Sequence, residues 1–264
     1  PPLLLHALHT GNSGYLNKWA QALPKPPADC TFFNFTASHD GIGLRPLEGL
    51  IPEEEKEQLA IKMQEFGGLV NYRSKPDGGQ SPYELNITYF DALKGTQSGT
   101  DNFQTERFLA SQTIMLAFKG VPAFYIHSFT ATPNYLEGVA LTGQNRTINR
   151  RKWNWDELTE ILKNETPHQK VFNALKKLIS IRKKQNSFHP DAKQEIMDLG
   201  PEFFVVVRTV ADNEKTILCI TNLTSEVQFI KLPEEFAKFR FDLIQGKKIE
   251  SFKLIPYQSL WLTE

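Results

Sequence analysis

The number of strands in the first 190 residues is the feature that most constrains the fold. Helical and strand patterns alternate over this stretch, as they do in a parallel sheet with helices between its strands. Only two segments have the character of barrel strands, the β-rich run TFFNFTASHDG at 31–41, which a glycine turn closes, and VPAFYIH at 121–127. A closed barrel of eight parallel strands usually takes about 250 residues. Because two strands cannot close a barrel, the chain contains either an unusual small α/β layer or the back part of a larger fold.

Apolar periodicity predicts the helices. The opening segment keeps Leu16, Trp19 and Leu23 on one helical face before the breaker PKPPAD. Further helices are expected at about 52–66, 101–119 and 167–185. The stretches 71–100 and 128–165 lack this periodicity and are rich in polar residues, so we expect loop insertions there, which are frequent sites of function.

Beyond residue 190 the pattern changes to short β segments. FFVVVR, TILCITN, VQFIKL, FRFDLI and SLWL follow one another across turns, and Phe239, Phe241 and Leu243 alternate with polar residues. Such alternation is typical of an antiparallel sheet with one solvated face. We therefore predict two domains. Residues 1–190 form an α/β domain with loop insertions at 71–100 and 128–165, and residues 191–264 form a C-terminal antiparallel β-sandwich.

Charge and hydropathy exclude several classes of function. Thirty basic and thirty acidic residues give no net charge, whereas nucleic-acid-binding proteins usually carry a basic excess. No apolar stretch reaches the roughly 18 residues that span a bilayer, and the first residues lack the pattern of a signal peptide. Cys30 and Cys219 lie far apart in apolar segments and are expected to be buried thiols of a reducing compartment. We therefore expect a cytoplasmic protein with no nucleic-acid or membrane partner.

Three polar residues at strand ends are candidates for chemistry. His39 and Asp40 lie at the C-terminal end of the first strand and His127 ends the second, and α/β barrels place catalytic groups at such strand ends. The same residues also have structural interpretations, because Asp-Gly forms turns and a neighbouring histidine can cap backbone groups. Spacing alone leaves both interpretations open for His39 and Asp40. For His127 it favours a histidine whose ring is satisfied at the edge of the core.

Polar residues in the two predicted loops suit a carbohydrate. Aromatic faces and planar hydrogen-bonding groups fit a sugar ring, and an arginine can bind phosphate or carboxylate through two parallel bonds. A solvated polar loop would account for the same residues. The histidines and cysteines lack metal-ligand spacing, and no phosphate-binding glycine loop occurs, so we predict no metal and no cofactor. The loop residues concerned are Tyr83, Glu84, Asn86, Arg146 and Arg150.

The stretch FNFTASHDGIGLRPLEG at 33–49 resembles glycoside hydrolase family 13, the α-amylase superfamily, and within it the sucrose phosphorylase group. Four further stretches are similar to that group in the same order, namely SPYELNITYFDAL, GVPAFYIHS, TGQNRTINRRKW and LIPYQSLWL. The resemblance covers essentially the whole chain. It implies that 1–190 is the last part of a (β/α)₈ TIM barrel, strands seven and eight with their helices, and that 191–264 is the family's C-terminal β-domain.

The resemblance also implies roles for five residues. Asp40 matches the catalytic carboxylate that stabilises the oxocarbenium-like transition state, and His39 matches a neighbour that hydrogen-bonds the glucosyl ring. Arg150 matches an arginine that helps to hold the glucosyl unit. Tyr83 and Glu84 fall in the loop that faces the acceptor sugar or phosphate. Sucrose phosphorylases typically have glutamine at the position of Glu84, and the glutamate is more similar to relatives that act on glucosylglycerate.

The activity implied by the resemblance is that of a retaining α-glucoside phosphorylase. Such an enzyme moves a glucosyl unit from sucrose, sucrose phosphate or glucosylglycerate to inorganic phosphate, yields α-glucose 1-phosphate and needs no cofactor. Two alternatives stay open. One is an amylase-type α-glucosidase or transglycosylase, and the other is a non-catalytic carbohydrate-binding module.

The same resemblance predicts an incomplete active site. A retaining mechanism needs a nucleophile and an acid/base carboxylate about 5 Å apart, and the family carries both on earlier barrel strands. The sequence contains no counterpart of the Gly-x-Arg-x-Asp nucleophile strand. We therefore expect this chain to be a C-terminal portion of a longer enzyme and to be inactive alone. Self-association or a missing N-terminal half would then cover the exposed edge of the sheet.

Overall fold

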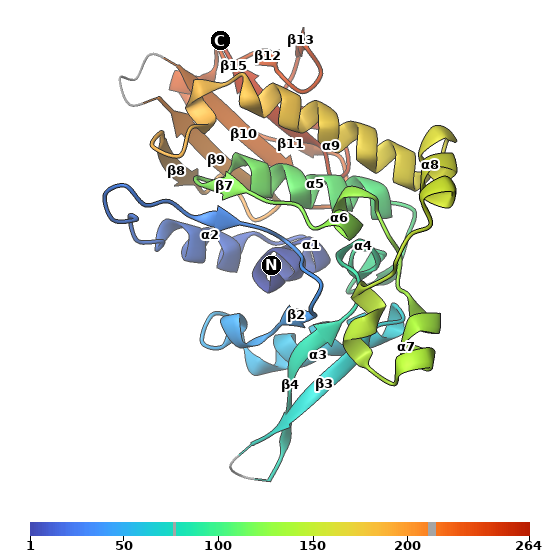
Figure 1. The fold of residues 1–264 in the computed structure, drawn as a ribbon. Helices are drawn as coiled ribbons and strands as arrows, with labels where there is room; N and C mark the ends of the chain where they lie inside the picture. The colour runs from blue at the N-terminus through green and yellow to red at the C-terminus, as the bar shows by residue number, and fades with distance from the viewer. Residues whose placement is uncertain (76–77, 211–214) are drawn as a thin grey trace. The chain divides into compact units, whose positions relative to one another are not determined.

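The computed structural model describes residues 1–75, 78–210 and 215–264 (Figure 1). The chain divides into two compact units that alternate along the sequence. Unit 1 comprises Pro1–Thr10, Phe35–Phe108 and Phe124–Asn173, and unit 2 comprises Gly11–Asn34, Leu109–Ala123 and Ala174–Glu264. This division does not coincide with the boundary expected near residue 190, so the predicted two-domain organisation stays a prediction.

Three of the predicted helices are confirmed. Helix α3 (Glu53–Glu65) matches the helix expected at 52–66, α5 (Gln104–Ala117) the one at 101–119, and α9 (Pro167–Lys183) the one at 167–185. In α3, Leu59 and Met63 are buried, and three glutamates occupy the first turn, where the positive end of the helix dipole stabilises them. The opening segment contains two helices, α1 (Pro2–Thr10) and α2 (Gly14–Gln21).

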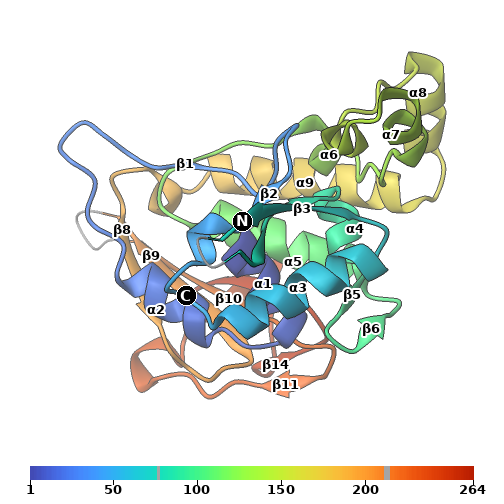
Figure 2. The ribbon, with the colours of Figure 1, turned by 90° about the horizontal axis from the view of Figure 1, so that it is seen from below.

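Two strands of a three-stranded antiparallel sheet in unit 1 lie in the first part of the first predicted loop. The order of the sheet is β2 (Ile42–Gly43), β4 (Gln80–Asn86) and β3 (Leu69–Ser74), and α3 packs against the hairpin β3–β4 (Figures 1 and 2). The loop predicted at 71–100 is therefore wrong over its described part, and residues 76–77 within it lie outside the described residues. The strand period is hidden by a bulge between Asn71 and Tyr72, which shifts the register by a residue.

Short helices and strands occur in the remainder of the first predicted loop and along the second predicted loop. The segment of α8 is amphipathic, and its N-cap Asn154 precedes an acidic first turn with Asp156 and Glu157, so the sequence does carry a helical signal there. None of the residues of α8 is buried. The loop predicted at 128–165 is therefore wrong as well. The elements are α4 (Tyr89–Ala92), β5 (Gly95–Thr96), β6 (Gly99–Thr100), α6 (Ile126–Phe129), α7 (Leu136–Thr142), η2 (Asn145–Asn149) and α8 (Trp155–Lys163).

The two predicted parallel strands are neighbours in unit 2. β1 (Phe33–Asn34) pairs in parallel with β7 (Val121–Pro122), with Phe33 opposite Val121. Gly120 enters β7 with a φ of +130°, and a Cβ there would lie 2.5 Å from the carbonyl oxygen of Phe32. Both strands are shorter than predicted. His127 does not end the second one, because the chain has already entered α6 at that position.

The C-terminal β segments form a six-stranded antiparallel sheet in unit 2. The run FFVVVR is continuous because all but the last residue of β9 are buried, as expected for a strand covered on both faces. The pair β11 (Gln228–Phe229) and β14 (Lys253–Leu254) forms a separate antiparallel ribbon (Figure 2). The predicted β segments are thus confirmed, whereas their arrangement as a sandwich stays a prediction. In sheet order the strands are β13 (Lys247–Lys248), β12 (Phe241–Asp242), β15 (Ser259–Thr263), β10 (Thr216–Asn222), β9 (Phe203–Thr209) and β8 (Lys193–Met197).

The cysteines differ in their surroundings. Cys219 on β10 is buried, as predicted, and burial raises the pKa of its thiol. Cys30 is exposed, so the prediction of a second buried thiol is wrong. The breaker PKPPAD separates Cys30 from the preceding helix α2. The chain around Cys30 has no regular structure that would cover the thiol. Throughout the described ranges, no helix combines the length and apolar character needed to cross a membrane.

Candidate active site

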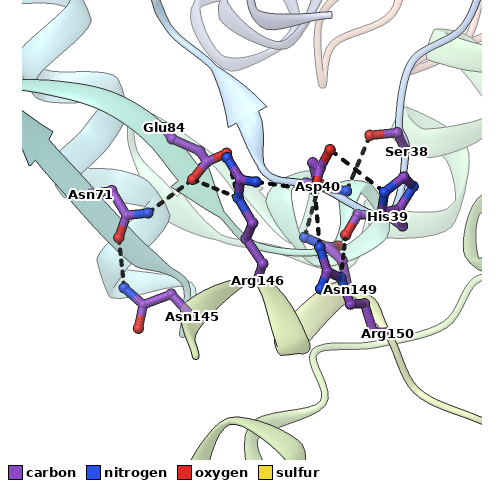
Figure 3. A network of polar contacts seen from close by, with 9 residues as sticks. All are labelled: Ser38, His39, Asp40, Asn71, Glu84, Asn145, Arg146, Asn149 and Arg150. Carbon is purple, nitrogen blue, oxygen red and sulfur yellow. Dashed lines mark hydrogen bonds and ion pairs between the residues drawn. The ribbon is translucent and has the colours of Figure 1, made fainter. Parts of the chain in front are cut away.

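Asp40 lies between β1 and β2 and is held by residues more than a hundred positions away. Arg150 donates from Nη2 to Asp40 Oδ1 at 3.0 Å and from Nε to the carbonyl oxygen of His39 at 3.2 Å (Figure 3). The amide of Asn149 donates to the carbonyl oxygen of Asp40 at 3.3 Å. The end of η2 thus fixes both the side chain and the backbone at Asp40. With 39% of its side chain exposed, the carboxylate remains accessible to a ligand.

Glu84 is the second carboxylate of the site. It projects from β4, is only 5% exposed and binds Arg146, which donates from Nη2 and Nε to Oε1 at 2.8 and 3.1 Å. Nη1 of Arg146 lies 3.4 Å from Asp40 Oδ1, so this guanidinium bridges the two carboxylates (Figure 3). The hydrogen bond to Glu84, followed by the charges of Glu84 and Asp40, raises the pKa of Arg146.

Two asparagines complete the network around Glu84. Asn71 on β3 donates from Nδ2 to Glu84 Oε2 at 2.8 Å, and Asn145 at the start of η2 donates from Nδ2 to Asn71 Oδ1 at 2.7 Å. Sequence analysis did not identify either residue. The signal that could have found Asn71 is the hairpin register, in which Asn71 lies directly opposite Glu84, but this register is apparent only once β3 and β4 are paired.

Gly41 allows the backbone beside Asp40 to approach β4. A Cβ at this position would lie 2.5 Å from Cγ of Glu84 and 2.7 Å from the carbonyl oxygen of Leu85. Any other residue would collide with the strand that carries Glu84. The glycine of the His-Asp-Gly sequence is therefore required here for close packing between the two acidic segments.

A cavity of about 140 Å³ adjoins Asp40 in unit 1. It is smaller than the roughly 300 Å³ at which small-molecule pockets usually begin. Its wall is partly apolar and partly polar, which suits a ring with apolar faces and a polar rim. The lining residues include Phe35, Ser38, Asp40, Ile87, Tyr89 and Asn149.

The structure brings together three of the five predicted site residues, Asp40, Glu84 and Arg150. His39 adjoins them with its ring largely exposed, 65%, and with Nε2 3.6 Å from Asp40 Oδ2. Tyr83 is half-buried on β4, and its backbone oxygen accepts a hydrogen bond from Leu44 at 2.8 Å. The roles assigned to all five residues stay predictions.

His127 has the structural surroundings that the sequence favoured. Its ring is buried, and Nε2 donates to the carbonyl oxygen of Arg151 at 3.0 Å. Burial, as the largest effect, lowers the pKa of this histidine. Within 1–75, 78–210 and 215–264, no group of three or more histidine, cysteine or acidic residues is arranged to hold a metal ion. The absence of a cofactor stays a prediction.

Comparisons with known proteins give a consistent picture. No family model matches the chain. The chain is 40% identical over 268 residues to glucosylglycerate phosphorylase of Escherichia coli, covering 99% of this chain and 46% of that protein. It is 25% identical over 225 residues to sucrose phosphorylase of Streptococcus mutans, covering 84% of this chain and 43% of that protein. The crystal structure of sucrose 6F-phosphate phosphorylase from Thermoanaerobacter thermosaccharolyticum matches with a TM-score of 0.72 and 22% identity, over 97% of this chain and 46% of the other.

The structural match indicates the mixed helix and sheet content of amylase-type proteins. The sequence matches confirm the resemblance found in the motifs, because the chain is similar over 99% of its length to a glucosylglycerate phosphorylase and over 84% of its length to a sucrose phosphorylase. The chain spans about half the length of the curated relatives it matches.

Proposed function

We propose that this chain is a C-terminal portion of a retaining α-glucoside phosphorylase that transfers a glucosyl unit to inorganic phosphate. The observation that carries the proposal is the cluster in which Arg146 and Arg150 hold Asp40 while Arg146 also holds Glu84. Its members come from the segments that carry the family motifs. The parallel pair β1–β7 is consistent with barrel strands seven and eight, and the six-stranded sheet with the family's β-domain.

The proposed reaction is a double displacement at the anomeric carbon. A carboxylate nucleophile forms a bond to this carbon while the glycosidic oxygen leaves with a proton from an acid/base carboxylate. Phosphate then attacks the same carbon and releases the nucleophile, so the configuration is retained. We assign the nucleophile and the acid/base to residues outside this chain.

Asp40 stabilises the positive charge that develops on the sugar ring in both steps. The arginines contact Oδ1, so we assign the contacts with sugar hydroxyls to Oδ2, the oxygen nearer to His39. A carboxylate that is already oriented needs no reorganisation when the charge appears, which is the main source of such electrostatic stabilisation.

The proposed donor is glucosylglycerate, with sucrose and sucrose phosphate as alternatives. Glucosylglycerate phosphorylase of Escherichia coli is 40% identical to the chain, against 25% for sucrose phosphorylase of Streptococcus mutans. Glu84 supports the same donor. Sucrose phosphorylases typically carry glutamine at this position, and a glutamate is more similar to the relatives that act on glucosylglycerate. In this site the charge of Glu84 is balanced by Arg146.

The test is an assay of the longest polypeptide encoded by the gene, with each of the three donors and with or without inorganic phosphate. We expect α-glucose 1-phosphate from glucosylglycerate, only when phosphate is present. Release of free glucose without phosphate would instead support an α-glucosidase or transglycosylase. Binding of the glucoside without turnover of any donor would support a carbohydrate-binding module.

A further inference from the structure

Two side chains hold the backbone on either side of Arg150. The hydroxyl of Tyr125 donates to the carbonyl oxygen of Asn149 at 2.6 Å, and Nε2 of His127 donates to the carbonyl oxygen of Arg151 at 3.0 Å. All of these residues belong to unit 1. The two acceptors are the carbonyl oxygens of the residues before and after Arg150. One residue likewise separates the two donors, Tyr125 and His127.

The start of α6 sets this spacing. Tyr125 is the N-cap residue of the helix, with extended backbone angles, and His127 lies in its first turn. Their rings are close, with centroids 4.8 Å apart at an interplanar angle of 48°. The pair therefore presents its two donors from rings that contact each other.

The held segment lacks a regular helix of its own. Arg150 follows the last residue of η2 with φ −128° and ψ 31°, and α8 begins only after its N-cap residue Asn154. Arg150 reaches from this segment to Asp40 Oδ1 and to the carbonyl oxygen of His39. A shift of its backbone would therefore move the guanidinium away from Asp40.

We propose that Tyr125 and His127 are positioning residues, which fix the backbone at Asn149 and Arg151 and thereby hold the guanidinium of Arg150 on Asp40. We call this pair the Tyr125–His127 clamp. Its effect on turnover rests on the proposed function, whereas its effect on Arg150 does not.

The protonation of both side chains fits this role. Burial raises the pKa of Tyr125, so the hydroxyl keeps the proton that it donates. Burial lowers the pKa of His127, which favours the neutral ring. Because a carbonyl can only accept, the proton of the neutral ring is on Nε2, and the buried Nδ1 has no hydrogen-bond partner among the described residues.

The first test measures Arg150 directly, by solvent exchange of its Nε–H in ¹⁵N-arginine-labelled protein. The Arg150→Lys variant assigns the signal. We expect Tyr125→Phe, which removes only the hydroxyl, to accelerate this exchange about tenfold, because the hydrogen bond to the His39 carbonyl would open more often. Tyr72→Phe, which removes a hydroxyl from an exposed tyrosine of β3, is the matched control and should leave the exchange unchanged.

A second pair of variants tests His127. His127→Gln keeps a donor near the position of Nε2 and should retain slow exchange, whereas His127→Leu removes the donor and should not. Unchanged exchange in both Tyr125→Phe and His127→Leu, in folded protein, would overturn the proposal.

Turnover provides an independent readout. In the complete gene product, we expect Tyr125→Phe to lower kcat about tenfold, because small displacements of a positioned group are costly. KM for phosphate should change less than twofold, because Arg150 acts through Asp40, which is assigned to the charge on the sugar ring. Fast exchange with unchanged kcat would overturn the positioning role. If the wild-type gene product forms no glucose 1-phosphate, the proposed function is rejected. Faster exchange of the Arg150 Nε–H in Tyr125→Phe would then still support the hold on Arg150.

Discussion

At the scale of single residues, the site depends on charges that neutralise one another. Asp40 and Glu84 supply two negative charges, and Arg146 and Arg150 supply two positive ones at distances of 2.8 to 3.4 Å. The arginines are partly exposed, so the energy of each pair is reduced by solvent. Their main effect is geometric, because a planar guanidinium fixes the orientation of the carboxylate that it binds.

The first prediction concerns the charge of Asp40. In the complete gene product, Asp40→Asn should lower kcat by a factor of about 100 or more, because a neutral amide stabilises a developing positive charge far less. Circular dichroism should show an unchanged fold. Asp191→Asn removes a carboxylate whose side chain is 87% exposed and serves as control, with normal turnover expected. Near-normal turnover of Asp40→Asn would remove Asp40 from the catalytic groups.

The second prediction concerns the close approach at Gly41. Gly41→Ala should lower the free energy of unfolding by about 1 to 3 kcal/mol and reduce activity, because the new methyl group would displace Glu84. Gly43→Ala is a matched control two residues away, since a Cβ there meets nothing within 4 Å. Urea denaturation of both variants measures the difference. Equal stability of the two variants would contradict the steric argument.

The third prediction concerns the buried His9 of α1, which contacts the carbonyl oxygen of Ala92 through Nε2 at 2.8 Å. Burial lowers the pKa of His9 from 6.5 to about 4. The unfolded chain therefore takes up the proton first as the pH falls. Its contribution to stability is complete above about pH 6.5 and decreases towards pH 4, with a loss of about 2 kcal/mol by pH 5.

The variant His9→Gln tests this pH dependence, because glutamine can donate to the same carbonyl and does not titrate. The free energy of unfolding of both proteins is measured by denaturant titration at pH 7 and pH 5. The wild type should lose more stability than the variant over this interval. Parallel losses would show that His9 is not the titrating group.

At the scale of elements, β9 carries a buried arginine that ties neighbouring segments of unit 2 together. Arg208 donates to the carbonyl oxygens of Ala117 and His189, each at 2.9 Å, and of Lys193 at 3.3 Å. Burial lowers its pKa to about 10, so it remains charged at neutral pH. The guanidinium also lies 5.9 Å from the centre of the Phe188 ring.

The fourth prediction follows from these bonds. Arg208→Met keeps an unbranched apolar stem but leaves the three carbonyls without this donor, and we expect it to lower the free energy of unfolding by about 3 kcal/mol. The control Lys215→Met replaces an exposed cation immediately before β10 and should change stability by less than about 0.5 kcal/mol. Thermal and urea unfolding give the comparison, and a loss in Arg208→Met no larger than in the control would contradict it.

At the scale of the whole molecule, the chain accounts for 46% of the length of its relative from Escherichia coli. The fifth prediction is that the chain by itself forms no glucose 1-phosphate, because the nucleophile and acid/base are assigned to residues outside it. The assay is run on the purified chain and on the longest gene product, and intact mass under denaturing conditions defines the species present. Phosphorolysis by the chain alone would place both carboxylates within its own residues.

Light scattering of the same samples tests whether the chain associates with itself. The sheet β1–β7 has two strands within the described residues, and Phe33 and Val121 on it are exposed apolar residues. Exposed apolar side chains on a small sheet favour association with another chain. We expect the isolated chain to self-associate and the complete product to do so less.

The elements that the sequence determined are those whose pattern is local. Helices α3, α5 and α9 have apolar stripes long enough to be recognised, and the C-terminal strands have continuous or alternating apolar runs. The family motifs were also sufficient to identify Asp40, Glu84 and Arg150 as candidates. Periodicity and motifs need no information about distant residues, which is why they could be interpreted without a structure.

The tertiary structure decided what depends on pairing between distant segments. The sequence predicts a loop where the hairpin β3–β4 lies, because its strands are stabilised by backbone pairing and its period is interrupted by the bulge at Asn71. The same pairing aligns Asn71 with Glu84, and the packing of η2 brings Arg146 and Arg150 to carboxylates 62 and 110 residues earlier. These contacts arise from chain folding over long separations, and no local pattern encodes such a register.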